Sequence, residues 1–234
     1  TFDGGVEGNV GIKTTTPTDY YADDLVVTAP DEGGITVVGG TTERNYLAFA
    51  DGTSGDARYR GLISYDHNTD KLGIGAGGGT KIELDGNGIM TNATQPAVIA
   101  YNNASNTASF SSADTYEIVQ FNIETIDKNA DYASSQTFTA PVDGTYYANA
   151  NVLRTASSSG SITYDLAIYV NSTLTLYARH HGDNSSTNTS TQNVTGLVDL
   201  DASDTLQVYA RVSDTKGRIY VSFSTSTFHG HLVA

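Results

Sequence analysis

Two histidines near the C-terminus have the spacing of a possible metal site. His229 and His231 are separated by a single residue. In a β-strand, side chains two positions apart share a face, so both imidazoles would point to the same side. Around a threefold axis, such a pair would gather six imidazoles, a set that can hold a transition metal. A single His-x-His motif is a weak signal, and side chains that point into the protomer interior or to the solvent are the stronger interpretation. We therefore predict no metal site.

Two further clusters combine an imidazole with a carboxylate, as acid–base catalysis requires. His180 and His181 precede Asp183, but neighbouring residues on a strand point to opposite faces, and no nucleophile motif accompanies them. Residues 182–184 are therefore interpreted as the start of a turn. Residues 66–70, DHNTD, are interpreted as a solvated turn between two short strands. No carboxylate pair shows the spacing of a hydrolase, so we predict neither an enzyme nor a cofactor.

Charge and composition narrow the classes of partner. The 234 residues include 26 acidic and 12 basic side chains, giving a formal net charge of −14. Such a field repels phosphate backbones and anionic lipid surfaces, which disfavours binding to nucleic acid or to a membrane surface. No apolar run is long enough to cross a bilayer, and we expect neither membrane insertion nor a signal peptide. Without cysteine, stability must come from burial, metals or oligomerisation.

The elements that must position these residues are β-strands. Serine, threonine, asparagine, glycine and tyrosine are abundant, and no stretch shows the helical period, so we predict an all-β protein. Up to about residue 91, apolar residues come in short bursts, such as 35–38 and 72–74, separated by glycine, aspartate and asparagine. Strands this short cannot enclose a core alone. We predict that residues 1–92 form a glycine-rich trimeric β shaft in which several copies supply each other's missing faces.

Longer strands follow the boundary that we place at residues 90–96. Alternation of apolar and polar residues marks strands with one buried face, for example Ile162, Tyr164 and Leu166, or Ile219, Val221 and Phe223. Turn signals recur at about the spacing of a sandwich or roll, so we predict that residues 97–234 form one domain of that type.

Two motifs in this second part resemble the C1q/TNF-like jelly-roll family. They are TFTAPVDGTYY at residues 137–147 and TFHGHL at residues 227–232. LVDLDASDTLQV at residues 197–208 is similar to a third family region, with Ser203 where glycine is usual. Residues 132–135 stand where relatives often have a glycine. The resemblance implies that residues 97–234 form a jelly roll, which is a homotrimeric recognition domain whose termini lie together at its base. In the family's order its strands would be residues 97–101, a short piece near Phe110, and residues 118–126, 137–140, 145–154, 162–171, 173–180, 188–200, 205–212 and 218–233.

Two motifs in the first part resemble trimeric phage tail fibres. GNVGIKTTTP at residues 8–17 is similar to a fibre punctuation motif, departing from it at Lys13, where glycine is common. YRGLISYDHNTDKLGI at residues 59–74 is similar to a segment often found ahead of a fibre tip. This resemblance implies an extracellular virion protein joined upstream to a tail or baseplate component.

The two resemblances together imply a receptor-binding tail-fibre protein that attaches a virus to a host surface glycan or protein. The alternative is a structural subunit of a virion or extracellular filament with no receptor role. Small polar loops at residues 155–161, 181–187 and 213–217 are expected at the distal end, opposite the base, with residues 102–107 as a further candidate. The candidate contact residues are Ser157, Ser158, Ser159, His181, Asp183, Asn184, Asp214 and Lys216.

Overall fold

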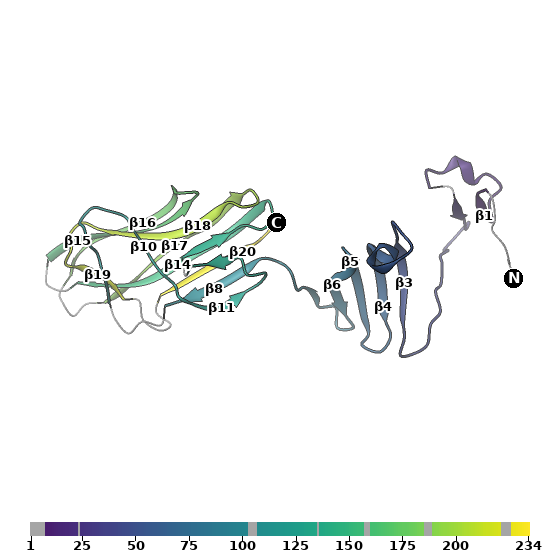
Figure 1. The fold of residues 1–234 in the computed structure, drawn as a ribbon, viewed down its shortest axis with the longest axis horizontal. Coiled ribbons are helices and arrows are strands. Elements are labelled where there is room, and N and C mark those ends of the chain that lie inside the picture. Colours follow the sequence, from purple (N-terminus) through teal and green to yellow (C-terminus); the bar gives the residue numbers. More distant parts are fainter. Residues whose placement is uncertain are drawn as a thin grey trace. The chain divides into compact units, whose positions relative to one another are not determined.

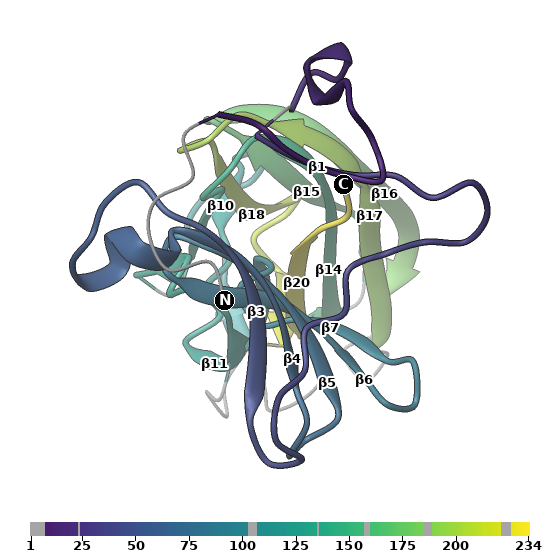
Figure 2. The same ribbon diagram turned by 90° about the vertical axis from the view of Figure 1, so that its right-hand side faces the viewer.

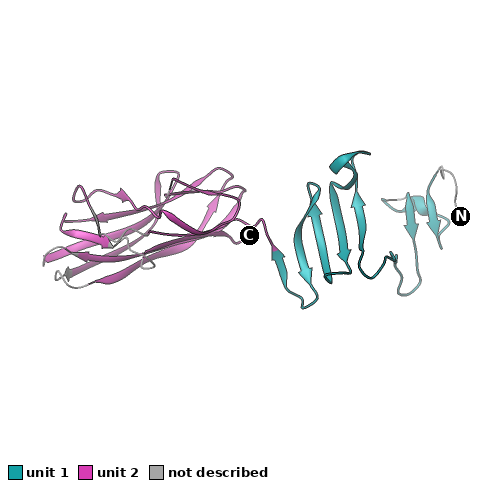
Figure 3. Ribbon diagram, turned by 60° about the horizontal axis from the view of Figure 1, so that its bottom comes forward, with its two compact units in different colours: residues 1–91 teal, residues 92–234 magenta. Residues whose placement is uncertain are grey.

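The computed structural model describes residues 8–22, 24–102, 107–134, 136–156, 160–184, 189–220 and 226–234. The chain divides into a first unit, Thr1–Thr91, and a second unit, Asn92–Ala234 (Figure 3). Helical structure in the described residues is limited to two short 3-10 turns, η1 (Pro17–Asp19) and η2 (Gly55–Tyr59). No helix in this part of the chain is long and apolar enough to span a membrane. The all-β prediction is confirmed.

The first unit is built around a five-stranded sheet. Its strands follow one another in chain order and lie side by side in Figures 1 and 2. They are β3 (Arg44–Phe49), β4 (Gly61–Asp66), β5 (Lys71–Ala76), β6 (Gly79–Asp85) and β7 (Met90–Asn92). The β4–β5 connection is the expected turn, because the Asp66 carboxylate accepts hydrogen bonds from the backbone N–H groups of Asn68 (3.0 Å) and Thr69 (3.3 Å).

A separate parallel pair, β1 (Val10–Ile12) and β2 (Leu25–Val27), precedes that sheet. The apolar burst at residues 35–38 forms no strand, which corrects the reading of every burst as a strand. Instead, the Val37 carbonyl accepts a hydrogen bond from the Asn45 side chain at 2.6 Å. A side-chain contact therefore holds this segment beside β3.

The second unit consists of two sheets that enclose one core. The larger sheet contains β8 (Ala97–Tyr101), β9 (Thr107–Ser109), β11 (Ile123–Asp127), β14 (Gly144–Ala156), β17 (Ser190–Leu200), β19 (Gly217–Tyr220) and β20 (Thr227–Leu232). The smaller sheet contains β10 (Glu117–Ile118), β12 (Tyr132–Ala133), β13 (Thr137–Thr139), β15 (Gly160–Val170), β16 (Thr173–Asn184) and β18 (Thr205–Val212). β14 pairs with β17 along one edge and with β20 and then β19 along the other. This two-sheet arrangement is the expected jelly roll (Figure 1).

Alternating side chains from both sheets fill the core, as the period-2 pattern predicts. Phe138, Tyr146, Leu166 and Phe228 are at most 1% exposed. The Phe138 and Tyr146 rings meet edge to face, with their centroids 5.7 Å apart. At Gly144, a Cβ would lie 2.6 Å from the Ala234 carbonyl oxygen. The absence of a side chain at Gly144 therefore allows the C-terminus to pack against the start of β14.

The strand predicted at residues 118–126 is wrong. β10 pairs with β18 in the smaller sheet, whereas β11 pairs with β8 in the larger one. Val119 and Phe121 are buried in the crossing between the sheets, at 3% and 1% exposure. A chain that passes through the core buries apolar side chains much as a strand does, so the pattern could not reveal the break.

Two further predicted strand ends differ from the structure. β16 continues through Asn184, because β15 begins at Gly160 and pairs with it as far as that residue. The predicted turn at residues 182–184 is therefore wrong. Of the long strand predicted at residues 218–233, the structure describes β19 and β20, and residues 221–225 between them lie outside the described residues. Of its alternating residues, Ile219 is buried, while Val221 and Phe223 lie outside the described residues.

Three departures from the expected glycine positions share one backbone geometry. Lys13, Ser134 and Ser203 have φ values of 60°, 56° and 78°, in the left-handed region. Glycine occupies this region without a steric penalty, whereas a residue with a Cβ does not. The three positions therefore keep the conformation that glycine favours, although the side chain has changed.

Candidate functional site

The strand ends that border three of the predicted contact loops lie at one end of the second unit, whereas residues 103–106, 157–159 and 185–188 lie outside the described residues. Gly160 pairs with Asn184, and Ala156 pairs with Gly217, so the β14–β15, β16–β17 and β18–β19 connections leave the sheets together. The segments that begin and end the unit lie at the opposite end, where the Thr145 N–H donates to the Ala234 carbonyl and the Leu232 N–H to the Pro96 carbonyl. This strand register agrees with the expected separation of base and distal end.

His181 is exposed at this distal end, but it lies in β16 and not in a loop. Its Nδ1 is 2.8 Å from the Thr163 hydroxyl, and its Nε2 is 3.3 Å from the Ser161 hydroxyl. Asp183 and Asn184 end the same strand. The imidazole is therefore part of a rigid polar surface on the β15–β16 hairpin. Ser157, Ser158 and Ser159 lie outside the described residues.

Asp214 and Lys216 form a local pair in the turn between β18 and β19. The Asp214 carboxylate accepts a hydrogen bond from the Lys216 backbone N–H at 2.9 Å. It also lies 3.6 Å from the Lys216 ammonium, and both side chains are about half exposed. An exposed pair of this type adds little to stability. Its donors and acceptors can still reach the hydroxyl or amide groups of a ligand.

A polar network closes the core beneath these connections. Arg154 is 6% exposed, and its guanidinium lies 5.1 Å from the centre of the Tyr164 ring. The Tyr164 hydroxyl donates to the Thr155 carbonyl, and the Gln192 side chain donates to the Ala178 carbonyl at 2.6 Å. Burial lowers the pKa of Arg154. Sequence reasoning missed the burial of Arg154. Its position could have indicated it, because Arg154 continues the alternation of buried residues along β14.

A second cluster, the Asp165 cluster, lies on the outward face of the smaller sheet. It consists of Asp165, Arg179, Arg211 and Tyr116. The Asp165 side chain is fully buried and receives hydrogen bonds from Arg211 at 2.6 Å and from Tyr116 at 3.3 Å, besides its ion pair with Arg179. Burial raises the pKa of Asp165, but the two guanidinium groups outweigh it, so the net pKa is lowered. Sequence reasoning missed this cluster because its members come from three strands and a loop.

A family model for the C1q domain matches residues 101–233, more than half of the chain. The chain belongs to the C1q family. C1q/TNF-like domains commonly form trimers, and they generally serve as ligand-binding or structural modules. The expected family resemblance of the second unit is thus confirmed, and the unit is called the C1q domain below.

Three solved structures are similar to the C1q domain in fold. The globular domain of zebrafish complement 1qA is 20% identical, covers 60% of this chain and 98% of its own, and has a TM-score of 0.44. Murine APRIL is 11% identical, with 59% and 99% coverage and a TM-score of 0.44. Eiger TNF from S. frugiperda is 13% identical, with 60% and 94% coverage and a TM-score of 0.47. No curated protein matches the sequence.

His229 and His231 lie on the outward face of the larger sheet of the C1q domain. Phe228 and Gly230 alternate with them and are buried, so neither imidazole points into the core. The His231 and Tyr147 rings lie 5.1 Å apart, and burial lowers the pKa of His229, with a further contribution from His231. Among the described residues, no group of three or more histidine, cysteine or acidic side chains is placed to hold a metal ion.

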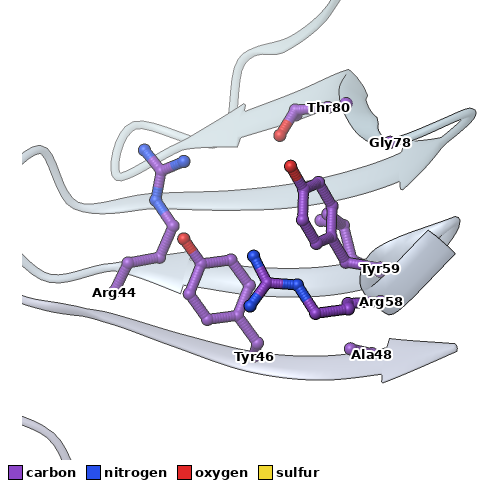
Figure 4. Close-up of a pocket in the computed structure, with 9 residues that line it drawn as sticks. Arg44, Tyr46, Ala48, Arg58, Tyr59, Gly78 and Thr80 are labelled. Carbon is purple, nitrogen blue, oxygen red and sulfur yellow. The ribbon is translucent and has the colours of Figure 1, made fainter. Parts of the chain in front are cut away.

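A hollow of about 580 Å³ in the first unit was not indicated by any sequence motif (Figure 4). Arg44, Tyr46, Arg58, Tyr59 and Thr80 line it, together with Ala48, Leu62, Gly78 and Gly79. Arg44 pairs with Asp66, and the Tyr59 hydroxyl donates to Asp56 at 3.1 Å. Figure 4 shows Arg58 and Tyr46 among the side chains that line the hollow. Arg44, Tyr46 and Ala48 alternate along β3, so the hollow opens on the face of the five-stranded sheet that carries the Arg44–Asp66 pair.

Proposed function

We propose that this chain is the receptor-binding protein of a virion tail fibre. It acts as a homotrimer that attaches the virus to a host cell-surface glycan or protein, and its upstream end joins a tail or baseplate component. Three findings support the proposal: the C1q domain, the fibre-like motifs at residues 8–17 and 59–74, and the polar distal end. The protein would then be located in the virion, outside the cell.

The separation of the two ends of the C1q domain carries the proposal. Residues 92–96 enter the domain beside its C-terminus, as the Leu232-to-Pro96 and Thr145-to-Ala234 hydrogen bonds show. The opposite end presents His181, Asp214 and Lys216 to solvent. A domain held at its base leaves this distal surface open to a ligand.

The outward face of the larger sheet supports the homotrimer. Strand register places Ala97, His231, Tyr147 and Leu197 in one row across it. Leu197 is 60% exposed, and Tyr147 is only half-buried. An apolar and aromatic row on an open face is typical of a surface that a neighbouring subunit covers. Three distal surfaces on one particle would bind with avidity, so each can be weak.

The test is binding of the labelled full chain to candidate host cells. Lys216→Ala and His181→Ala change the distal end, while Lys128→Ala removes an equally exposed lysine at the base and is the matched control. We expect the two distal variants to lose binding at least tenfold and the control to bind like the original chain.

Two outcomes would contradict the proposal. Equal binding by all three variants would exclude the distal end as the contact surface. A trimer that binds no candidate host cell would instead favour the structural subunit, the alternative function.

A further inference from the structure

The five-stranded sheet of the first unit has two faces of opposite character. Strand register defines six rows across it, and side chains in successive rows point to opposite faces. We call one the charged face; it carries Arg44, Asp66, Lys71, Glu83 and Asp85. We call the other the apolar face. Its paired positions hold Asn45, Leu47, Phe49, Gly61, Ile63, Tyr65, Leu72, Ile74, Ala76, Ile82 and Leu84.

Most charged side chains on the charged face form ion pairs within one chain. Lys71 pairs with Glu83 across two strands at 2.9 Å, and Arg44 pairs with Asp66. Near the middle of this face, Leu62 and Ser64 are only 7% and 4% exposed. A Cβ on Gly75 would lie 2.8 Å from the Leu62 side chain, so the packing there is close. This face therefore suits direct contact with water.

The apolar face is uncovered. Leu47 and Phe49 are each 59% exposed, Ile74 is 48% exposed and Ile63 is 41% exposed. No paired position on this face carries a charge. An exposed apolar surface of this extent, with both ion pairs between strands on the reverse side, is typical of an interface and not of a solvated sheet.

The covering partner must be present whenever this unit folds. Val26 and Leu62 are the only hydrophobic side chains buried among the described residues of the first unit. A sheet with so small a core of its own is not expected to be stable alone. A partner that is encountered only occasionally cannot meet this need, whereas further copies of the same chain are always available during folding.

We propose that the apolar face is the shared core of a threefold assembly of this chain. Three sheets meet through their apolar faces, and the row Leu47, Ile63, Ile74 and Ile82 lies nearest the axis. This row is central in each sheet, and the middle of a flat face comes closest to the axis when three such faces close a prism. The inference rests on the homotrimer of the proposed function. It adds which face is buried, and it leaves the charged face and its hollow on the outside.

The adjacent residues Leu47 and Tyr46 provide a matched test. Both belong to β3, both are more than half exposed in one chain, and they point to opposite faces. Because the chain has no cysteine, each of the full-length variants Leu47→Cys and Tyr46→Cys carries a single thiol. The particle mass is measured by light scattering, thiol reactivity with a bulky maleimide, and cross-linking with a short bismaleimide.

We expect a particle of three times the 24.7 kDa chain mass. The thiol of Leu47→Cys should react at least tenfold more slowly than that of Tyr46→Cys and should cross-link pairs of chains, whereas Tyr46→Cys should give no cross-linked pair. Particles of three copies in which both thiols react equally would overturn this inference but leave the homotrimer standing. A monomer would overturn both, and a dimer would exclude the threefold axis.

Discussion

Arg179 holds Asp165 through two hydrogen bonds, from Nε to Oδ1 at 2.7 Å and from Nη2 to Oδ2 at 2.9 Å. Asp165 is fully buried, so its replacement leaves cationic partners without their counter-charge. Removing one member of a fully buried ion pair costs about 3–5 kcal/mol. Because Arg179 is half exposed, we expect Asp165→Asn to lower the free energy of unfolding by about 2 kcal/mol at pH 7. Urea unfolding followed by tyrosine fluorescence measures this, with the exposed Asp201→Asn as the control.

The same pair predicts a loss of stability in acid. The net pKa of Asp165 is lowered in the folded protein, so the stabilisation is complete above the ordinary aspartate pKa of about 3.9 and disappears as the pH falls through the folded value. We expect Asp165→Asn to destabilise the protein less at pH 3 than at pH 7. An equal effect at both pH values would show that the carboxylate charge is not what stabilises the cluster.

Ser203 should be replaceable by glycine with a gain in stability. Its φ of 78° costs a residue with a Cβ about 1 kcal/mol, and glycine avoids this cost. The backbone hydrogen bond from the Ser203 N–H to the Ala140 carbonyl, at 2.7 Å, would remain. We expect Ser203→Gly to raise the midpoint of thermal unfolding by a few degrees. Ser203→Ala retains the Cβ and should give no gain, so equal gains in both variants would rule out backbone strain as the cause.

His229 should make the C1q domain less stable below neutral pH. Burial lowers its pKa, and the charge of His231 lowers it further, so the folded protein favours the neutral imidazole. Stability is therefore complete above the unfolded histidine pKa of about 6.5 and falls as the pH drops through the lower folded value. We expect His229→Gln to flatten the dependence of the unfolding midpoint between pH 7 and pH 5. His67→Gln, in the first unit, controls for the loss of an imidazole, and an unchanged profile for His229→Gln would argue against this assignment.

Leu197 should contribute to the trimer proposed for the C1q domain. It is 60% exposed on the outward face of the larger sheet, in the same row as Tyr147. Leu197→Asp would place a charge in a buried interface, so we expect a lower average particle mass by light scattering. Thr139→Asp adds the same charge to the outward face of the smaller sheet and should keep the mass of the original chain. A Leu197→Asp particle of unchanged mass would place the interface elsewhere.

Much of the strand pattern could be predicted because alternation records burial locally. The strand at Thr205–Val212 was predicted with the bounds that the structure shows, and each even-numbered residue in it is buried. The pattern failed at residues 118–126, where a chain crossing between sheets buries Val119 and Phe121 much as a strand does. It also gave no sign that β16 reaches Asn184, since that extension depends on its pairing with β15.

The candidate site was predictable in outline only. The polar character of the distal connections followed from their composition, and the placement of His181, Asp214 and Lys216 at one end followed from strand order. The contacts beneath these residues could not be predicted in this way, because Arg154 meets Tyr164 across the core and Gln192 reaches the Ala178 carbonyl. These contacts join strands of different sheets, so no local spacing marks them.

The sequence by itself determined the all-β architecture, the order of most strands and the family of the second unit, because turn residues and side-chain alternation act locally. Only the tertiary structure decided which strands share a sheet. It thereby placed Arg179 and Arg211 on either side of Asp165 and turned Leu47 and Ile63 to the uncovered face of their sheet. The physical reason is that pairing register depends on the whole fold, and register decides which distant side chains share a face.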